Sequence, residues 1–190
     1  MQINFIREVL QEFDDNHINY CLLRNYQFLL GSLEPVESMD TVISKEDMPK
    51  ANQILTNFNF IQRKQQFSLQ HKAYFKIFNS KVLSFDIQVG GVHWNDMRYL
   101  DEIILKNRVK KDFFYVPSDN DTFVMLLTHS ILGKRYFKPK YQQILRSLVI
   151  DENYVLKHLS RIFNKNIAKN LLHSIKENSF HKIKTYQLAC

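Results

Sequence analysis

Two aspartates, Asp40 and Asp86, have the residue type and setting that metal chemistry requires. Asp40 follows Ser38 by two positions at the start of an apolar run, so both side chains share a face if that run is a strand. Asp86 lies on the polar side of the alternating segment 82–89. If these two strands are neighbours, the carboxylates meet. They can then hold one or two Mg²⁺ ions that bridge a triphosphate and activate an attacking hydroxyl.

Each of these residues also has an ordinary structural interpretation. An aspartate at a strand start is often a loop-end residue, and Asp86 can be a solvent-facing position on an open sheet. Gly31 and Ser32 form a turn that lets the backbone approach phosphates, because glycine has no Cβ, but they can equally be a plain turn.

Basic residues supply the candidate phosphate contacts. Arg24 ends an apolar run and either binds phosphate or satisfies loop carbonyls. Lys134 begins a run of cations and aromatics, 134–141, that suits a triphosphate, a nucleic-acid backbone or a solvated loop. The net charge of +7 favours polyanionic partners. Nucleic acid ranks last among them, since we recognise no nucleic-acid motif.

The elements that position these residues follow from periodicity. We expect a helix over 3–15, strands over 20–23 and 39–43, and a helix capped by Ser44. A hairpin over 73–78 and 82–89 turns at Asn79-Ser80. A short helix over 97–106 and an edge strand over 113–116 follow, and the remainder is helical. The fold class is therefore α/β (α+β). A small mixed sheet flanked by helices occupies 1–116, and a helical portion occupies 117–190.

The composition limits the classes of protein to which this chain can belong. Hydrophobic residues make up 45% and charged residues 24%, as in a globular domain. With two cysteines in unrelated settings, no charged-then-apolar leader and no long apolar stretch, we expect a cytoplasmic protein without a membrane partner. Four glycines are too few and too scattered for a P-loop or a dinucleotide-binding loop.

The motif order resembles that of the polymerase-β-type nucleotidyltransferase superfamily. That family has an apolar-Gly-Gly/Ser turn, then Asp-x-Asp/Glu about ten residues later, then a third carboxylate on a later strand. The segment 20–26, Tyr-Cys-Leu-Leu-Arg-Asn-Tyr, is similar to a strand and turn of its bacterial and archaeal members associated with polysaccharide or small-molecule modification. Pro117-Ser118, the helix that follows and Lys134 are similar to the next part of that pattern. The resemblance covers residues 18 to about 150.

The resemblance implies a nucleoside triphosphate as donor, Mg²⁺ on Asp40 and Asp86, and a small-molecule or saccharide acceptor. Gly31, Ser32, Arg24 and Lys134 would contact the donor. One departure matters, because Ser38 stands where the family has its first acid. A neutral hydroxyl replaces a carboxylate ligand, so two hypotheses remain open. The chain is either a metal-dependent nucleotidyltransferase or an inactive module of the same fold that binds a nucleotide or a partner.

Overall fold

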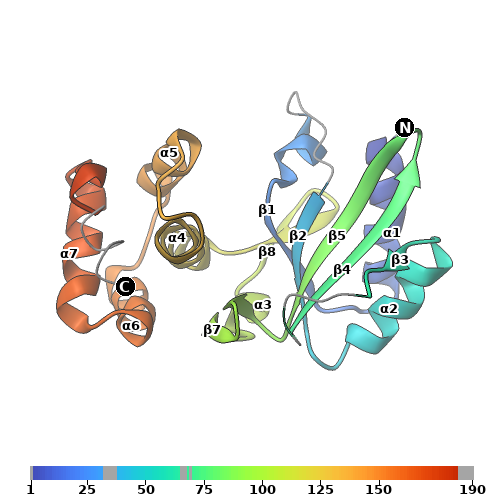
Figure 1. Cartoon of the computed structure of the whole chain (residues 1–190), viewed down its shortest axis with the longest axis horizontal. Helices are drawn as coiled ribbons and strands as arrows, with labels where there is room; N and C mark the ends of the chain where they lie inside the picture. Colours follow the sequence, from blue (N-terminus) through green and yellow to red (C-terminus); the bar gives the residue numbers. More distant parts are fainter. Residues whose placement is uncertain (1, 32–37, 65–67, 69, 184–190) are drawn as a thin grey trace. The chain divides into compact units, whose positions relative to one another are not determined.

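The computed structural model describes residues 2–31, 38–64, 68 and 70–183. The chain divides into two compact units, Met1–Pro117 and Ser118–Cys190. The first unit contains all strands of the five-stranded sheet, and the second contains helices (Figure 1).

The five-stranded sheet of the first unit has the order β1-β2-β5-β4-β3. β2 and β5 run parallel, whereas the other neighbouring pairs are antiparallel. The predicted mixed sheet is thereby confirmed. The strands are β1 (Tyr20–Arg24), β2 (Ser38–Ile43), β3 (Ile61–Gln62), β4 (His71–Phe78) and β5 (Lys81–Val89).

One face of this sheet packs on two helices, α1 (Gln2–Asp15) and α2 (Met48–Asn57) (Figure 1). The apolar face of α1 follows the helical period, and its core side chains have no exposed surface. Strands β2 and β5 contribute alternate residues to the same core, among them Met39 and Phe85. The intervening residues of both strands therefore point to the opposite face.

The predicted β4–β5 hairpin is confirmed, and its turn residues Asn79 and Ser80 both have positive φ, 49° and 61°. Two local predictions were wrong. The helix α2 has Asp47 rather than Ser44 at its N-cap position. The predicted pairing of these two residues is nevertheless present in the preceding turn, where the Asp47 N–H donates to Ser44 Oγ at 3.1 Å and the Ser44 hydroxyl donates to Asp47 Oδ2. The segment expected to be one short helix forms a strand followed by a helical turn.

That segment contains the hairpin of β6 (Val92–Trp94) and β7 (Met97–Leu100), followed by α3 (Ile103–Lys106). Gly91 explains the difference, since a Cβ there would lie 2.4 Å from the Leu100 carbonyl oxygen. Glycine thus permits a close approach that favours the hairpin. A second small hairpin, β8 (Val109–Lys111) and β9 (Phe114–Val116), ends the first unit.

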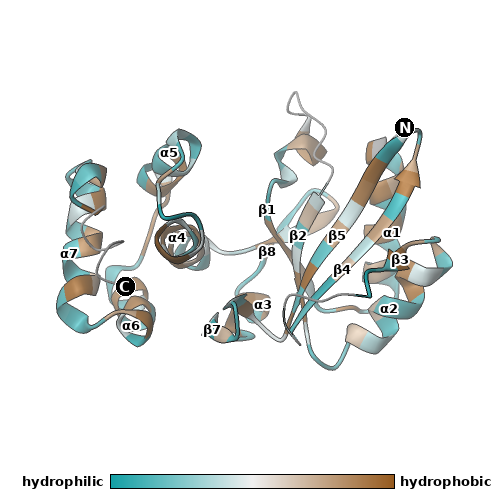
Figure 2. Ribbon diagram, in the orientation of Figure 1, coloured by the Kyte–Doolittle hydropathy of each residue, from teal (hydrophilic) through white to brown (hydrophobic). Residues whose placement is uncertain are grey.

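The second unit is helical, as predicted. Ser118 caps its first helix, because the Asp121 N–H donates to Ser118 Oγ at 3.2 Å. Residues 121–128 are all buried, and the apolar run 123–127 accounts for the brown colour of α4 in Figure 2. Its elements are α4 (Asp119–Thr128), the π-helix η2 (His129–Lys134), α5 (Pro139–Ser147), α6 (Glu152–Ile162) and α7 (Lys165–Lys176). Within the described residues, no helix is long and apolar enough to cross a membrane.

Candidate active site

The two candidate carboxylates lie side by side. β2 and β5 pair in parallel so that Asp40 is directly opposite Asp86, and Ser38 is opposite Ser84. Directly opposed residues of neighbouring strands point to the same face. Their apolar neighbours Met39 and Phe85 face the core, so both aspartates project from the face opposite α1 and α2. The sheet therefore brings together two acids that are far apart in the sequence.

Arg24 joins the acid pair through a bulge in β1. Leu22 is opposite Thr41, but Arg24 is opposite Asp40, so β1 uses one extra residue there. Simple alternation would put Arg24 on the core face with Leu22, and the bulge instead turns it toward Asp40. Arg24 Nε and one terminal nitrogen each lie 3.0 Å from Asp40 Oδ2. Asn25 Nδ2 donates to the same oxygen at 3.3 Å.

Asp86 has a basic neighbour of its own. His71 lies on β4 two residues before Ala73, which is opposite Asp86, so the imidazole reaches the carboxylate diagonally on the shared face. His71 Nε2 contacts Asp86 Oδ1. The Asp86 side chain is 35% exposed, compared with 14% for Asp40. No sequence pattern marks His71 as part of the site, because its contact with Asp86 depends on the β4–β5 register.

Burial dominates the electrostatics of Asp40. Burial raises the pKa of Asp40, the Arg24 guanidinium lowers it, and the charge of Asp86 raises it again. Tyr99 on β7 belongs to the same environment. Burial raises the pKa of the Tyr99 phenol, with smaller opposing effects from Arg24 and Asp40. The phenol therefore stays protonated and can act as a hydrogen-bond donor at this site.

The remaining predicted residues are distributed as follows. Ser38 begins β2 on the same face as Asp40, and it is partly buried. Gly31 ends the 3₁₀-helix η1 (Tyr26–Leu30) with φ 88°, and nothing lies within 4 Å of the position of a Cβ. Ser32 lies outside the described residues. Lys134 belongs to the second unit, where it is exposed at the end of η2.

The chemistry of the donors suits Mg²⁺ only in part. Among the described residues, no group of three or more His, Cys, Asp or Glu side chains is arranged to hold a metal ion. Mg²⁺ is commonly bound by one or two carboxylates together with waters and the phosphates of a substrate. Asp40 and Asp86, with the Ser38 hydroxyl nearby on the same face, match that limited donor set.

A cavity of about 450 Å³ lies at the end of β5. Gln88 lies two residues beyond Asp86 on the same face, and its side-chain oxygen accepts from the His93 N–H. Burial lowers the pKa of the His93 imidazole, so it is favoured as the neutral form. The cavity has a strongly polar lining of Lys45, Gln70, Val89, Gly90, His93, Asp96, Arg98 and Glu102.

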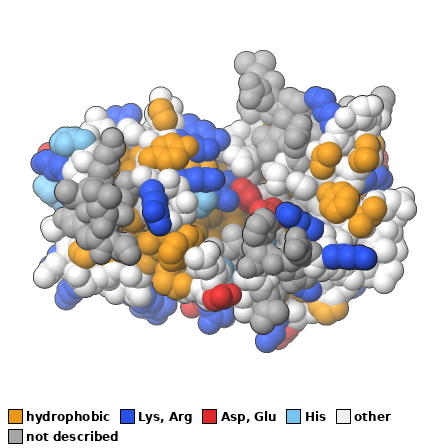
Figure 3. Space-filling model, viewed as in Figure 1, with side chains coloured by type: hydrophobic (Ala, Val, Ile, Leu, Met, Phe, Trp, Pro, Cys, Tyr) orange, Lys and Arg blue, Asp and Glu red, His pale blue; other side chains and the backbone are white. Residues whose placement is uncertain are grey.

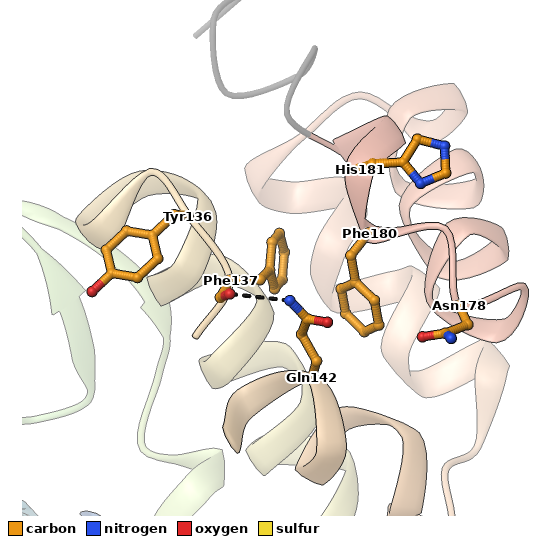
Figure 4. Close-up of a pocket in the computed structure, with 6 residues that line it drawn as sticks. All are labelled: Tyr136, Phe137, Gln142, Asn178, Phe180 and His181. Atoms are coloured by element: carbon orange, nitrogen blue, oxygen red, sulfur yellow. Dashed lines mark hydrogen bonds between the residues drawn. The ribbon is translucent and has the colours of Figure 1, made fainter. Parts of the chain in front are cut away.

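A cavity of similar size, about 450 Å³, lies in the second unit. Figure 4 shows that Phe137 and Phe180 face each other across it, with ring centroids 5.3 Å apart. Gln142 spans one side and donates to the Phe137 carbonyl at 3.1 Å. The lining residues are Tyr136, Phe137, Gln142, Asn178, Phe180 and His181, none of them acidic. This cavity therefore offers no carboxylate ligand for a metal ion.

Comparison with known proteins adds to this geometry. No protein-family model matches the sequence, and no curated protein matches it. The structure is similar to the solution structure of the antibiotic-resistance factor ANT(2'')-Ia, with a TM-score of 0.50 and 8% identity, over 100% of this chain and 98% of that chain. It is also similar to the crystal structure of ANT(2'')-Ia in complex with adenylyl-2''-tobramycin, with a TM-score of 0.51 and 8% identity, over 93% and 98%. The chain therefore shares the fold of these structures, a mixed α/β unit followed by a helical one.

Proposed function

We propose that this protein transfers a nucleoside monophosphate from a nucleoside triphosphate to a hydroxyl of a small-molecule or saccharide acceptor. The observation that carries the proposal is the direct pairing of Asp40 with Asp86 on parallel strands, with both side chains on one face. The fold supports it, because the neighbouring structure holds adenylyl-2''-tobramycin, an adenylylated small molecule. A cytoplasmic location remains part of this proposal.

In this proposal Asp40 and Asp86 hold Mg²⁺. The ion would neutralise phosphate charge and favour the deprotonated acceptor hydroxyl. The acceptor oxygen forms a bond to the α-phosphorus, the bond from that phosphorus to the bridging oxygen breaks, and pyrophosphate leaves. Arg24 and Asn25 bind phosphate oxygens, and Gly31, which has no Cβ, lets the backbone approach the phosphates closely.

The cavity beyond Asp86 is where we place the acceptor. Lys45 and Arg98 can bind anionic groups of an acceptor, and Asp96 and Glu102 can bind cationic ones. A pocket with such a lining suits a polar, hydroxyl-bearing molecule better than an apolar one. Lys134 stays a prediction from the sequence.

The test is pyrophosphate release from each of the four nucleoside triphosphates with Mg²⁺, using amino sugars and neutral saccharides as trial acceptors. We expect Asp86→Asn to lower turnover by about 100- to 1,000-fold, the range for losing one group that stabilises transition-state charge. The matched control is Asp112→Asn. Asp112 is an exposed aspartate of the same unit that pairs with Arg7, and this variant should keep full turnover. Equal turnover in wild type and Asp86→Asn would refute the assignment.

A second candidate is an inactive module that binds a nucleotide. Two observations favour it: Ser38 stands where the family has its first acid, and both carboxylates already contact basic side chains of the chain. Calorimetry separates the candidates, because the module binds a triphosphate without releasing pyrophosphate for any acceptor. The enzyme releases pyrophosphate in proportion to product.

A further inference from the structure

We propose that Arg24 and His71 are internal counter-ions of the acid pair, and that Arg24 moves from Asp40 to the nucleotide phosphates when nucleotide binds. A divalent cation would then bind tightly only together with a nucleotide. The inference rests on the proposed function and adds an order of binding to it. It concerns Arg24 chiefly, because two nitrogens of this residue contact the same Asp40 oxygen.

The first support is the number of donors on a single oxygen. Asp40 Oδ2 receives Arg24 Nε at 3.0 Å, an Arg24 terminal nitrogen at 3.0 Å and Asn25 Nδ2 at 3.3 Å. A carboxylate oxygen has two lone pairs, so three donors occupy its coordination capacity. A metal ion that binds this oxygen must displace the guanidinium.

The second support is the cost of that displacement. The side chains of Arg24 and Asp40 are 16% and 14% exposed, so neither charge is well solvated. A metal ion alone would take Asp40 and leave Arg24 as a poorly hydrated cation beside another cation, which is unfavourable. A triphosphate removes the conflict, because a planar guanidinium binds phosphate as well as it binds carboxylate.

The third support is the place of Arg24 in the chain. The bulge in β1 turns its side chain out of the core face and toward Asp40. Asn25 follows with φ 61°, and the chain then enters η1, which ends at the Gly31 turn. Arg24 and the proposed phosphate turn therefore belong to one short segment. The exchange requires a rotation of the Arg24 side chain and no movement of the sheet.

His71 completes the arrangement on the other strand. Its Nε2 contacts Asp86 Oδ1, so the second carboxylate also has a donor from the chain itself. Each acid thus contacts a basic side chain of the chain itself without a metal ion.

The experiment measures Mn²⁺ binding by electron paramagnetic resonance, with and without a non-hydrolysable triphosphate. In wild type we expect nucleotide to tighten Mn²⁺ binding roughly 10-fold, within the usual range for coupling between two ligands. In Arg24→Gln, Mn²⁺ alone should bind roughly 10-fold more tightly than in wild type, and nucleotide should bind more weakly. The factor by which nucleotide tightens Mn²⁺ binding should therefore fall to nearly one in this variant.

The matched control is Arg7→Gln, which removes a half-exposed arginine that pairs with Asp112 elsewhere in the same unit. It should bind Mn²⁺ and nucleotide as wild type does. Arg24→Lys keeps the charge without the planar fork and should show intermediate coupling. Near-ultraviolet circular dichroism of each variant verifies folding. If Arg24→Gln does not fold, Arg24→Lys replaces it as the test variant.

Two outcomes overturn the inference, and they are distinguishable from failure of the proposed function. If wild type binds Mn²⁺ with nucleotide and releases pyrophosphate, but the Arg24 variants bind bare Mn²⁺ no better than wild type, the inference alone fails. If no protein binds Mn²⁺ with nucleotide and no pyrophosphate appears, the proposed function fails and the inference fails with it.

Discussion

The two faces of strands β2 and β5 differ in what they contribute to the protein. Residues facing α1 and α2, such as Met39 and Phe85, are buried in an apolar core. The residues between them, Asp40 and Asp86, form a polar pair on the opposite face. One pair of strands therefore supplies the stability of the unit on one side and the candidate chemistry on the other.

The open face is itself divided. Beyond the acid pair, toward the β4–β5 turn, its side chains become apolar and exposed, and Figure 3 shows hydrophobic side chains gathered over this part of the sheet. Ile77 and Val82 are opposite each other and are 74% and 49% exposed. Residue type alone therefore does not identify the core of this unit. The covering helices decide which apolar residues stabilise the fold.

The largest expected effect is on the covered face. Phe85 has no exposed surface and packs against Phe60, with centroids 5.4 Å apart, and against Phe13 at 6.1 Å. Phe85→Ala should lower the free energy of unfolding by about 3–5 kcal/mol, because it opens a cavity at the centre of the core. Urea titration measures this change, with the midpoint shifting and the slope constant. A loss below about 1 kcal/mol would show that the helices do not cover this face as described.

On the open face we expect a smaller change in the free energy of unfolding, and this change should be a stabilisation. The pKa of Asp40 is raised by burial, so the folded state disfavours the charged carboxylate at neutral pH. For an acid with a raised folded pKa, the unfolded state loses its proton first, and stability falls as pH rises through that window. Asp40→Asn removes this penalty, so it should be more stable than wild type at pH 7 in metal-free buffer.

The gain should vanish at pH values below the ordinary value of 3.8, where the carboxyl group is protonated in both states. Thermal unfolding of wild type and Asp40→Asn at pH 7 and near pH 3 gives the comparison. A variant that is less stable than wild type at pH 7 would mean that the Arg24 contact outweighs the burial of Asp40.

The smallest effect is expected where an apolar residue lies on the open face. Ile77→Thr should change the free energy of unfolding by no more than about 0.5 kcal/mol, because a side chain that is 74% exposed loses little packing. The same change at Ile87, which is fully buried on β5, is the matched comparison and should be clearly destabilising. Equal losses at the two positions, measured by urea titration, would erase the difference between the faces.

Local sequence patterns predicted several elements because their causes are local. The helix over 3–15 follows from the spacing of Ile6, Val9 and Phe13, all without exposed surface. The β4–β5 hairpin follows from alternation and from Asn79-Ser80, which tolerate the positive φ that a tight turn requires. The polar side of β5 was likewise readable from alternate residues. It placed Asp86 away from the core.

Other features were not readable, because they arise from contacts between distant segments. The β6–β7 hairpin depends on the approach of Gly91 to Leu100, which no local pattern reveals. Alternation along β1 assigns Arg24 to the core face with Leu22, and only the bulge reverses this. His71 lacked any sequence signal, since its contact with Asp86 depends on how β4 pairs with β5.

The sequence by itself determined which face of β5 is polar, because alternation along a strand is a local property of the backbone. It thereby placed Asp86 away from the core, and it placed Asp40 on one face with Ser38. Only the tertiary structure decided that β2 lies parallel to β5 with Asp40 and Asp86 opposite each other, and that Arg24 reaches Asp40. Strand partner and register are set by packing between segments far apart in the chain, and that packing leaves no trace in local periodicity.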